Sequence, residues 1–97
     1  MIRVLIVYDI SDNRKRKKLS DYLKSKGLSR IQRSAFIGKV THSLLMDIER
    51  VIPRYIDREH DILHIFPITD YTLRYMKAYG KPLADIAGEE QRAVVTI

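Results

Sequence analysis

Two groups of charged residues near the N-terminus have the types and the spacing needed for phosphate chemistry. Asp9 ends an apolar run, Val4–Tyr8, and an unbroken run of five cations, Arg14–Lys18, follows after a short gap. A carboxylate can hold a hard cation such as Mg²⁺ together with water and phosphate oxygens, and clustered Lys and Arg side chains neutralise phosphates. The alternative for Asp9 is a structural role, in which its carboxylate accepts nearby amides or pairs with Arg16.

Composition and motifs exclude several other kinds of active site. The 97 residues contain no Cys, which rules out disulfides, Cys-ligated zinc and thiol catalysis. The histidines, His42, His60 and His64, form no H-E-x-x-H pattern, and each is more typical of a surface or half-buried side chain than of a ligand. The sequence has no Walker loop, no G-x-G-x-x-G and no nucleophile elbow.

Positive charge is concentrated in the first part of the chain. The net charge is +6, and residues 1–40 hold 11 basic and 3 acidic residues, whereas residues 41–97 hold 7 basic and 9 acidic. Such a basic half is typical of a nucleic-acid-binding domain; the alternative is a solvated charged surface. The longest apolar run is too short for a membrane span, and no charged leader with a long apolar segment opens the sequence, so we expect a cytoplasmic protein with no membrane partner.

The residues around Asp9 are predicted to form a strand followed by a helix. Met1–Ile10 alternates with large aliphatic side chains on both faces, which predicts a central strand that is covered on both sides. Ser11–Asn13 can cap a helix that ends at Gly27. The cations in the first turns of this helix oppose its dipole, a penalty that a bound polyanion would offset or that salt and flexible side chains make negligible.

The rest of the chain alternates between extended and helical patterns. Ser29–Val40 is extended in character and forms either one strand or two short strands. A helix capped by Thr41 or Ser43 follows, and Pro53 is expected to end or kink it. The remaining predicted elements are strands at Asp61–Pro67 and Leu73–Tyr79, joined by a turn at Thr69-Asp70, then a polar linker at Lys81–Gln91 and a short C-terminal strand at Ala93–Ile97.

This order of elements leaves one face of the sheet bare. Right-handed crossovers place both helices on the same face, yet Leu5 and Val7 are apolar on the other. In so short a chain the simplest cover is a second copy, packed sheet to sheet about a two-fold axis, with Ala93–Ile97 added to the edge of the partner's sheet. Two Asp9 carboxylates would then meet across the axis and repel each other unless they share a proton or a cation. The predicted metal site is therefore a symmetric pair of Asp9 side chains holding Mg²⁺.

Several short motifs, in this order and at this spacing, resemble a known family. The residues that carry the resemblance are Val7-Tyr8-Asp9-Ile10-Ser11-Asp12, Arg16 with the Lys-rich helix, Gly27-Leu28, Arg30-x-Gln32-x-Ser34-x-Phe36-x-Gly38 and Phe66-Pro67-Ile68-Thr69. Together they resemble the small CRISPR-associated protein family Cas2, the partner of the Cas1 integrase, over almost the whole chain. Lys18 stands where some members have Arg, a change that keeps the charge but loses the bidentate fork.

The resemblance implies both a fold and an activity. The implied fold is an α+β, ferredoxin-like βαββαβ sandwich over residues 1–80, with an antiparallel sheet, two helices on one face and Ser29–Val40 as two strands. Residues 81–97 are then a linker and an extra C-terminal strand that completes the partner's sheet in a homodimer. The implied function is spacer acquisition, either as a Mg²⁺-dependent endonuclease on single-stranded RNA or double-stranded DNA, with Mn²⁺ as an alternative metal, or as a non-catalytic DNA-binding scaffold that bridges Cas1 integrase subunits.

The resemblance also assigns roles to individual residues. Asp9 matches the metal-binding aspartate of the family, and Arg16 and Arg30 match its functional basic positions. We therefore expect Asp9, Arg16 and Arg30 to be the catalytic residues. The expected nucleic-acid contacts, taken from the basic run and from the family motif together, are Arg14, Lys15, Arg16, Lys18, Arg30, Ser34 and Phe36.

Overall fold

Local sequence signals set the bounds of most elements in residues 1–80, which are the residues that the computed structural model describes. The elements of the sheet and of its helical layer are β1 (Ile2–Asp9), α1 (Asn13–Ser25), β2 (Ser29–Gln32), β3 (Ala35–Val40), α2 (His42–Val51), the 3-10 helix η1 (Ile52–Tyr55) and β4 (Ile62–Ile68). Asp12 is the N-cap of α1, and Gly27, with a φ of +90°, follows its end. Pro53 lies in the first turn of η1, where α2 gives way to 3-10 geometry, as its missing N–H requires.

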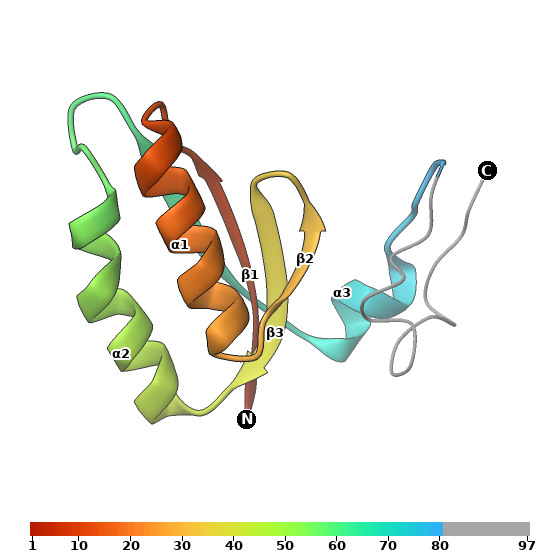
Figure 1. The fold of residues 1–97 in the computed structure, drawn as a ribbon. Coiled ribbons are helices and arrows are strands. Elements are labelled where there is room, and N and C mark those ends of the chain that lie inside the picture. Colours follow the sequence, from red (N-terminus) through yellow and green to blue (C-terminus); the bar gives the residue numbers. More distant parts are fainter. Residues whose placement is uncertain (81–97) are drawn as a thin grey trace. The chain divides into compact units, whose positions relative to one another are not determined.

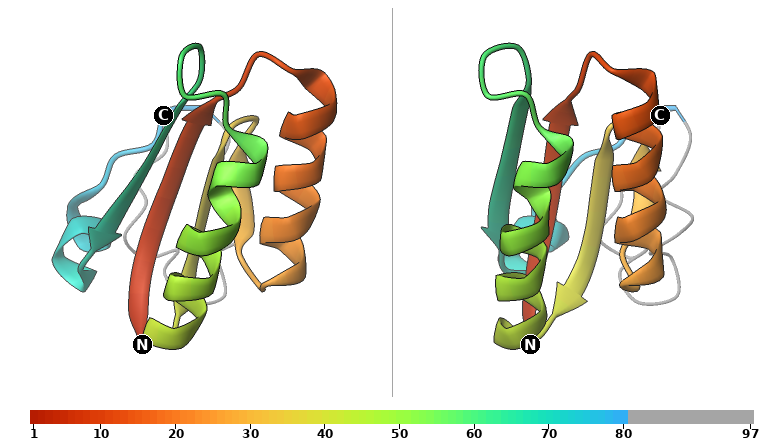
Figure 2. Two further views of the ribbon diagram at one scale, coloured as in Figure 1. Left: turned by 90° about the vertical axis from the view of Figure 1, so that its left-hand side faces the viewer. Right: turned by 60° about the vertical axis from the view of Figure 1, so that its left-hand side comes forward.

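The four strands form one sheet in the order β2-β3-β1-β4. Strand β3 pairs antiparallel with both β1 and β2, with Ile6 opposite Phe36 and Arg30 also opposite Phe36. Figure 2 shows β4 running against the direction of β1 on its other side. The element order and the strand order together are those of the ferredoxin-like βαββαβ fold, which confirms the predicted fold class. The segment Ser29–Val40, left open by its own pattern, forms two strands.

The core lies between the sheet and the two helices, which cover the same face of the sheet (Figure 1, Figure 2). Its buried members are Val4, Ile6, Tyr8, Ile10, Leu19, Leu23, Leu28, Phe36, Val40 and Ile48. Gly38 lets β3 approach Leu28 closely, because a Cβ at this position would lie 3.0 Å from the side chain of Leu28 and 3.1 Å from its backbone. Val4, Ile6 and Tyr8 share one face of β1 and are buried in this core, and Ile2 on the same face packs against it.

The opposite face of the sheet is called the outer face here. It carries Leu5, Val7 and Asp9 of β1, and by the strand alternation also Ile62 and Phe66 of β4, because Leu63 and Ile65 pack against the core. Val7 is 37% exposed, Phe66 47% and Ile62 54%. These exposed fractions agree with the prediction that a single chain leaves apolar side chains of this face incompletely covered.

One predicted element is wrong. Residues 73–79 were expected to form a strand, but Asp70–Tyr75 form a helix, α3. Thr69 is its N-cap, with a side chain that accepts a hydrogen bond from the Thr72 amide, and Asp70 places a negative charge in the first turn. These two residues were interpreted as a turn, whereas they begin a helix. The chain divides into Met1–Pro67 and the residues from Ile68 onward, so α3 is described by itself; the predicted linker and C-terminal strand lie outside the described residues.

Candidate active site and nucleic-acid interface

Tyr8 and Asp9, the last two residues of β1, lie on opposite faces of the sheet. Tyr8 is 3% exposed and belongs to the core, whereas Asp9 is exposed at the strand end on the outer face. Strand alternation fixes this division, because successive side chains point to opposite sides. The predicted metal ligand is thus accessible from the surface and is placed away from the helical layer.

The loop between β1 and α1 is tied to the first turn of the helix by Arg16. The Nη1 of Arg16 donates a hydrogen bond to the carbonyl oxygen of Ile10 at 2.7 Å, and its Nη2 donates to the Oδ1 of Asn13. Arg16 is half-buried as a result. The guanidinium therefore holds the backbone just after Asp9, and it keeps further N–H donors for a ligand.

Asp12 offsets the positive charge at the start of α1. Its Oδ1 accepts hydrogen bonds from the backbone amides of Arg14, at 2.8 Å, and Lys15, at 3.0 Å. The hydrogen bond from the Lys15 amide is the largest cause that holds the pKa of Asp12 below its usual range. The run Arg14–Lys18 is therefore tolerated at a helix N-terminus partly because an ionised cap precedes it, so the charge run does not by itself require a polyanion.

The five cations of this run face different directions. Lys15 and Arg16 are half-buried, whereas Arg14, Lys17 and Lys18 are exposed. Lys17 forms an ion pair with Asp21 at 3.0 Å. Arg14 and Lys18 are thus the members of the run best placed to reach a nucleic-acid backbone in solution.

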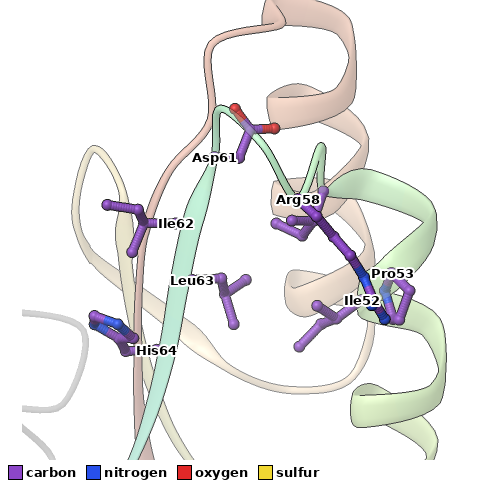
Figure 3. Close-up of a pocket in the computed structure, with 8 residues that line it drawn as sticks. Ile52, Pro53, Arg58, Asp61, Ile62, Leu63 and His64 are labelled. Carbon is purple, nitrogen blue, oxygen red and sulfur yellow. The ribbon is translucent and has the colours of Figure 1, made fainter.

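Asp61 is a residue of the site region that the sequence analysis missed. It lies at the start of β4 and is 9% exposed (Figure 3). Its Oδ1 accepts hydrogen bonds from the amide and the hydroxyl of Ser11, at 3.0 and 3.1 Å, and its Oδ2 accepts the Asp57 amide at 2.9 Å. The amides of Asp57 and then Ser11 lower the pKa of Asp61. Fifty residues separate Asp61 from Ser11, and the local sequence gives no sign of this contact.

The turn between β2 and β3 lies beside the end of β1. The Tyr8 amide donates to the carbonyl oxygen of Ser34 at 3.0 Å, and the Nη2 of Arg30 donates to that of Arg33 at 2.9 Å. A cavity of about 380 Å³, called the basic pocket here, opens between this turn and α1. Its lining consists of Tyr8, Asn13, Arg16, Lys17, Ser20, Asp21, Lys24, Arg30 and Arg33. The structure thus brings the two predicted catalytic arginines to one cavity, on the helical side of the sheet.

Phe36 occupies a different kind of place from the other expected nucleic-acid contacts. It is fully buried, and its ring stacks on that of Tyr8 with a centroid distance of 6.4 Å. A side chain with no exposed surface cannot stack on a base without a rearrangement of the core. Its geometry supports a positioning role behind Tyr8. Ser34 contributes its backbone carbonyl, and its side chain is half-buried.

The part of the chain that the structure describes offers few metal ligands. Within residues 1–80, no group of three or more His, Cys, Asp or Glu side chains is placed to hold a metal ion. Asp9 is the one predicted ligand among these residues, and no group of side chains within residues 1–80 completes a metal site around it. A metal at Asp9 needs oxygens from a second molecule, from water or from a substrate.

A second, more apolar cavity of about 410 Å³ lies between η1 and β4. Figure 3 shows Leu63 and Ile52 pointing towards each other, while Ile62 and His64 point away on the other side of β4. None of the predicted catalytic or nucleic-acid-binding residues lines this cavity. The alternation seen in the figure agrees with the assignment of Ile62 to the outer face.

Comparisons with known proteins agree with the fold and with the family resemblance of the sequence. The family model described as CRISPR associated protein Cas2 matches residues 1–76. A Korarchaeum cryptofilum protein named CRISPR-associated endoribonuclease Cas2 is 39% identical over 80 residues, which is 82% of this chain and 86% of the relative. A Thermoproteus tenax protein named CRISPR-associated endonuclease Cas1/endonuclease Cas2 fusion is 34% identical over 70 residues, 72% of this chain and 26% of the fusion.

A solved structure supports the fold independently. The crystal structure of Streptococcus pyogenes Cas2 at pH 6.5 matches with a TM-score of 0.68 at 22% identity, over 76% of this chain and 94% of that chain. At this identity the likeness concerns the fold alone. In residues 1–80, the structure contains no helix that is long and apolar enough to cross a membrane.

Proposed function

This chain belongs to the CRISPR-associated protein Cas2 family, and on that premise we propose that it is a metal-dependent endonuclease of CRISPR spacer acquisition. Its substrate is single-stranded RNA or double-stranded DNA, in which it hydrolyses phosphodiester bonds. The observation that carries the proposal is the exposed carboxylate of Asp9 at the end of a buried central strand. The name of the Korarchaeum cryptofilum relative, an endoribonuclease, favours RNA.

The proposal requires a homodimer that is packed through the outer face. Val7, Ile62 and Phe66 are apolar and partly exposed on this face, and a second copy would remove them from water. The same packing would bring the two Asp9 carboxylates together across the two-fold axis. Dimerisation thus supplies both the missing cover and the missing ligand.

The donor set of an Asp9 pair fits a hard cation such as Mg²⁺, which commonly takes one or two carboxylates and completes its shell with water and phosphate oxygens. Mn²⁺ accepts the same oxygen ligands. Bound there, the ion would supply Lewis acidity, which lowers the pKa of water and offsets charge on the phosphate. The two Asp9 carboxylates would hold it, and its charge would relieve their mutual repulsion.

The cations supply the remaining chemistry from the chain's own residues. Arg16 and Arg30 are held by the carbonyl oxygens of Ile10 and Arg33, so their remaining donors need little reorganisation to stabilise the negative charge that develops on phosphate oxygens. Arg14 and Lys18 are exposed and would hold the strand through its backbone phosphates. Lys15 would add charge from the inner side of the same turn.

The experiment that tests this proposal compares Asp9→Ala with Asp47→Ala, a control that removes an exposed carboxylate on α2. Wild type and both variants are incubated with single-stranded RNA and with duplex DNA across Mg²⁺ concentrations. We expect Asp9→Ala to lose cleavage at least ~100-fold while it keeps the dimer and its melting temperature, and Asp47→Ala to cleave as wild type does. Persistent cleavage by Asp9→Ala would falsify the catalytic assignment.

A second candidate function is a non-catalytic scaffold that holds duplex DNA between Cas1 integrase subunits. The Thermoproteus tenax fusion, in which the two proteins form one chain, favours this association with Cas1. In this version Asp9→Ala leaves DNA binding and integration unchanged. Replacing the exposed cations Arg14 and Lys18 with Gln weakens binding uniformly across sequences and lowers the slope of log affinity against log salt by up to about 2. A flat salt response in the wild type contradicts this version.

A further inference from the structure

The side chains that line the basic pocket carry a net positive charge, as those of an anion-binding site do. Its lining holds five cations and one carboxylate, Asp21, and that carboxylate is already paired with Lys17 at 3.0 Å. The cations come from α1 and from the hairpin of β2 and β3, two elements that are held together by the core. The excess positive charge is therefore collected around one cavity by the fold, and does not depend on the sequence run Arg14–Lys18 alone.

The second, independent observation is Tyr8, which lines this pocket and whose hydroxyl is buried. Tyr8 is 97% buried, since its exposed fraction is 3%, and within residues 1–80 its Oη has no hydrogen-bond partner. Buried hydroxyls are nearly always paired, because an unpaired one has lost its water without replacement. Burial raises the pKa of Tyr8, and the charges of Arg30 and Arg16 act in the opposite direction. The hydroxyl thus keeps its proton at neutral pH and can donate.

The arginines of the pocket are oriented before any ligand arrives. Arg30 is fixed by the carbonyl oxygen of Arg33 and Arg16 by that of Ile10, at 2.9 and 2.7 Å. Each guanidinium carries five N–H donors, so donors are left over on both. A ligand with several acceptor oxygens and negative charge would satisfy them together with the Tyr8 hydroxyl.

We propose that the basic pocket binds a phosphate monoester, either the terminal phosphate of a nucleic-acid strand or free phosphate. A monoester is favoured over an internal phosphodiester because the Tyr8 hydroxyl is fully enclosed. A terminal group carries sugar on one side only and can present several oxygens to a buried donor, whereas a diester is flanked on both sides. The pocket shares Arg16 and Arg30 with the proposed cleavage machinery, so this inference deepens the proposed function and rests on it in part. Tyr8 is a further residue of the pocket, on the face of β1 opposite to Asp9.

The test titrates the ¹⁵N-labelled full-length chain in metal-free buffer at constant ionic strength and follows the backbone amides. The ligands are inorganic phosphate and a short single-stranded oligonucleotide with or without a 5′-phosphate. The variants are Tyr8→Phe, which keeps the ring stacked on Phe36, and Arg33→Gln, matched by Arg58→Gln outside the pocket. No metal is present and no cleavage is measured, so the result is separate from the fate of the Asp9 proposal.

We expect Tyr8→Phe to weaken phosphate binding about tenfold or more, because a hydrogen bond to a charged group is lost. Without phosphate this variant unfolds at the same or a higher temperature, because it removes a buried hydroxyl that had no partner. Arg33→Gln weakens binding severalfold and Arg58→Gln less than twofold. Tighter binding of the 5′-phosphorylated strand supports a strand end as the source, and equal binding of the two strands with Tyr8-dependent inorganic phosphate supports free phosphate. Equal affinity of wild type and Tyr8→Phe, or equal effects of the two arginine variants, overturns the proposal.

Discussion

The two faces of β1 differ in how far the rest of the same chain buries their side chains. On the helical face, Ile6 is fully buried and Tyr8 nearly so, against α1, β3 and the core. On the outer face, Val7 is 37% exposed and Asp9 is exposed. The residues alternate one by one along the strand, so the chemistry of the two faces differs although the sequence is continuous.

This difference separates two kinds of site. The basic pocket is built within residues 1–67 and needs only a ligand, whereas a metal site at Asp9 needs oxygens that the other side chains of residues 1–80 do not bring. Arg16 touches both regions, because it lines the pocket and holds the carbonyl oxygen of Ile10, the residue after Asp9. Variants at Tyr8 on the helical face and at Val7 on the outer face should therefore separate phosphate binding from dimerisation.

The largest expected effect comes from a charge on the outer face, Val7→Asp. In a dimer packed through this face the new carboxylate would be buried without a partner, which is costly enough to dissociate the two copies. We expect the variant to sediment as a monomer, to lose cleavage and to keep its phosphate affinity. Met46→Asp, a change at a 67% exposed residue of α2, is the control and remains a dimer. A dimeric Val7→Asp with full activity would place the interface elsewhere.

A smaller effect distinguishes Ile6 from its neighbour Leu5. Ile6→Ala removes a fully buried side chain, and we expect it to lower the free energy of unfolding by about 2–5 kcal/mol at any protein concentration. Leu5 is half-buried, so Leu5→Ala costs less in the monomer, and its cost grows with concentration as the dimer interface is lost. Urea unfolding of both variants at two concentrations measures this. If both variants lost the same free energy of unfolding at both concentrations, Leu5 would not lie at a dimer interface and the two faces would not differ.

The alternation of β1 and the ends of α1 could be predicted because their causes are local. Period-two apolar residues, the capping oxygen of Asp12 and the positive φ of Gly27 lie within a few residues of what they determine. The same local reasoning failed at Thr69 and Asp70, which were interpreted as a turn and instead begin α3. The side chains of Thr and Asp suit both a turn and a helix N-terminus, and only the conformation of the residues that follow distinguishes the two.

The composition of the site was less predictable, because its contacts are distant in sequence. Arg16 and Arg30 were named through a family resemblance, but nothing local shows that they share a cavity with Tyr8. Phe36 was expected at a nucleic-acid surface and is instead fully buried behind Tyr8. Asp61 was seen only as the first residue of a predicted strand, because its partner Ser11 lies fifty residues away.

The smallest expected effect concerns Asp61. Its carboxylate accepts hydrogen bonds from Ser11, in the loop between β1 and α1, and it lies on neither face of β1. Its folded-state pKa lies below the ordinary value of 3.8, because the amides of Asp57 and Ser11 stabilise its charged form. A depressed pKa contributes stability that is fully present above the unfolded value and is lost as the pH falls through the folded value. Melting temperatures of wild type and Asp61→Asn should therefore differ near neutral pH, with the wild type higher, and converge below pH 3.8.

The matched control for this prediction is Asp47→Asn, which changes an exposed carboxylate whose partner is Arg50, one turn along the same helix. Exposed pairs of this kind contribute little, so its curve should stay close to the wild type at every pH. If Asp61→Asn also followed the wild type, the hydrogen bonds to Ser11 would not stabilise the fold. If instead the convergence appears together with weaker phosphate binding at neutral pH, the loop between Ile10 and Arg16 positions the basic pocket as well as Asp9. Asp61 would then influence both the basic pocket and Asp9, although its carboxylate lies on neither face of β1.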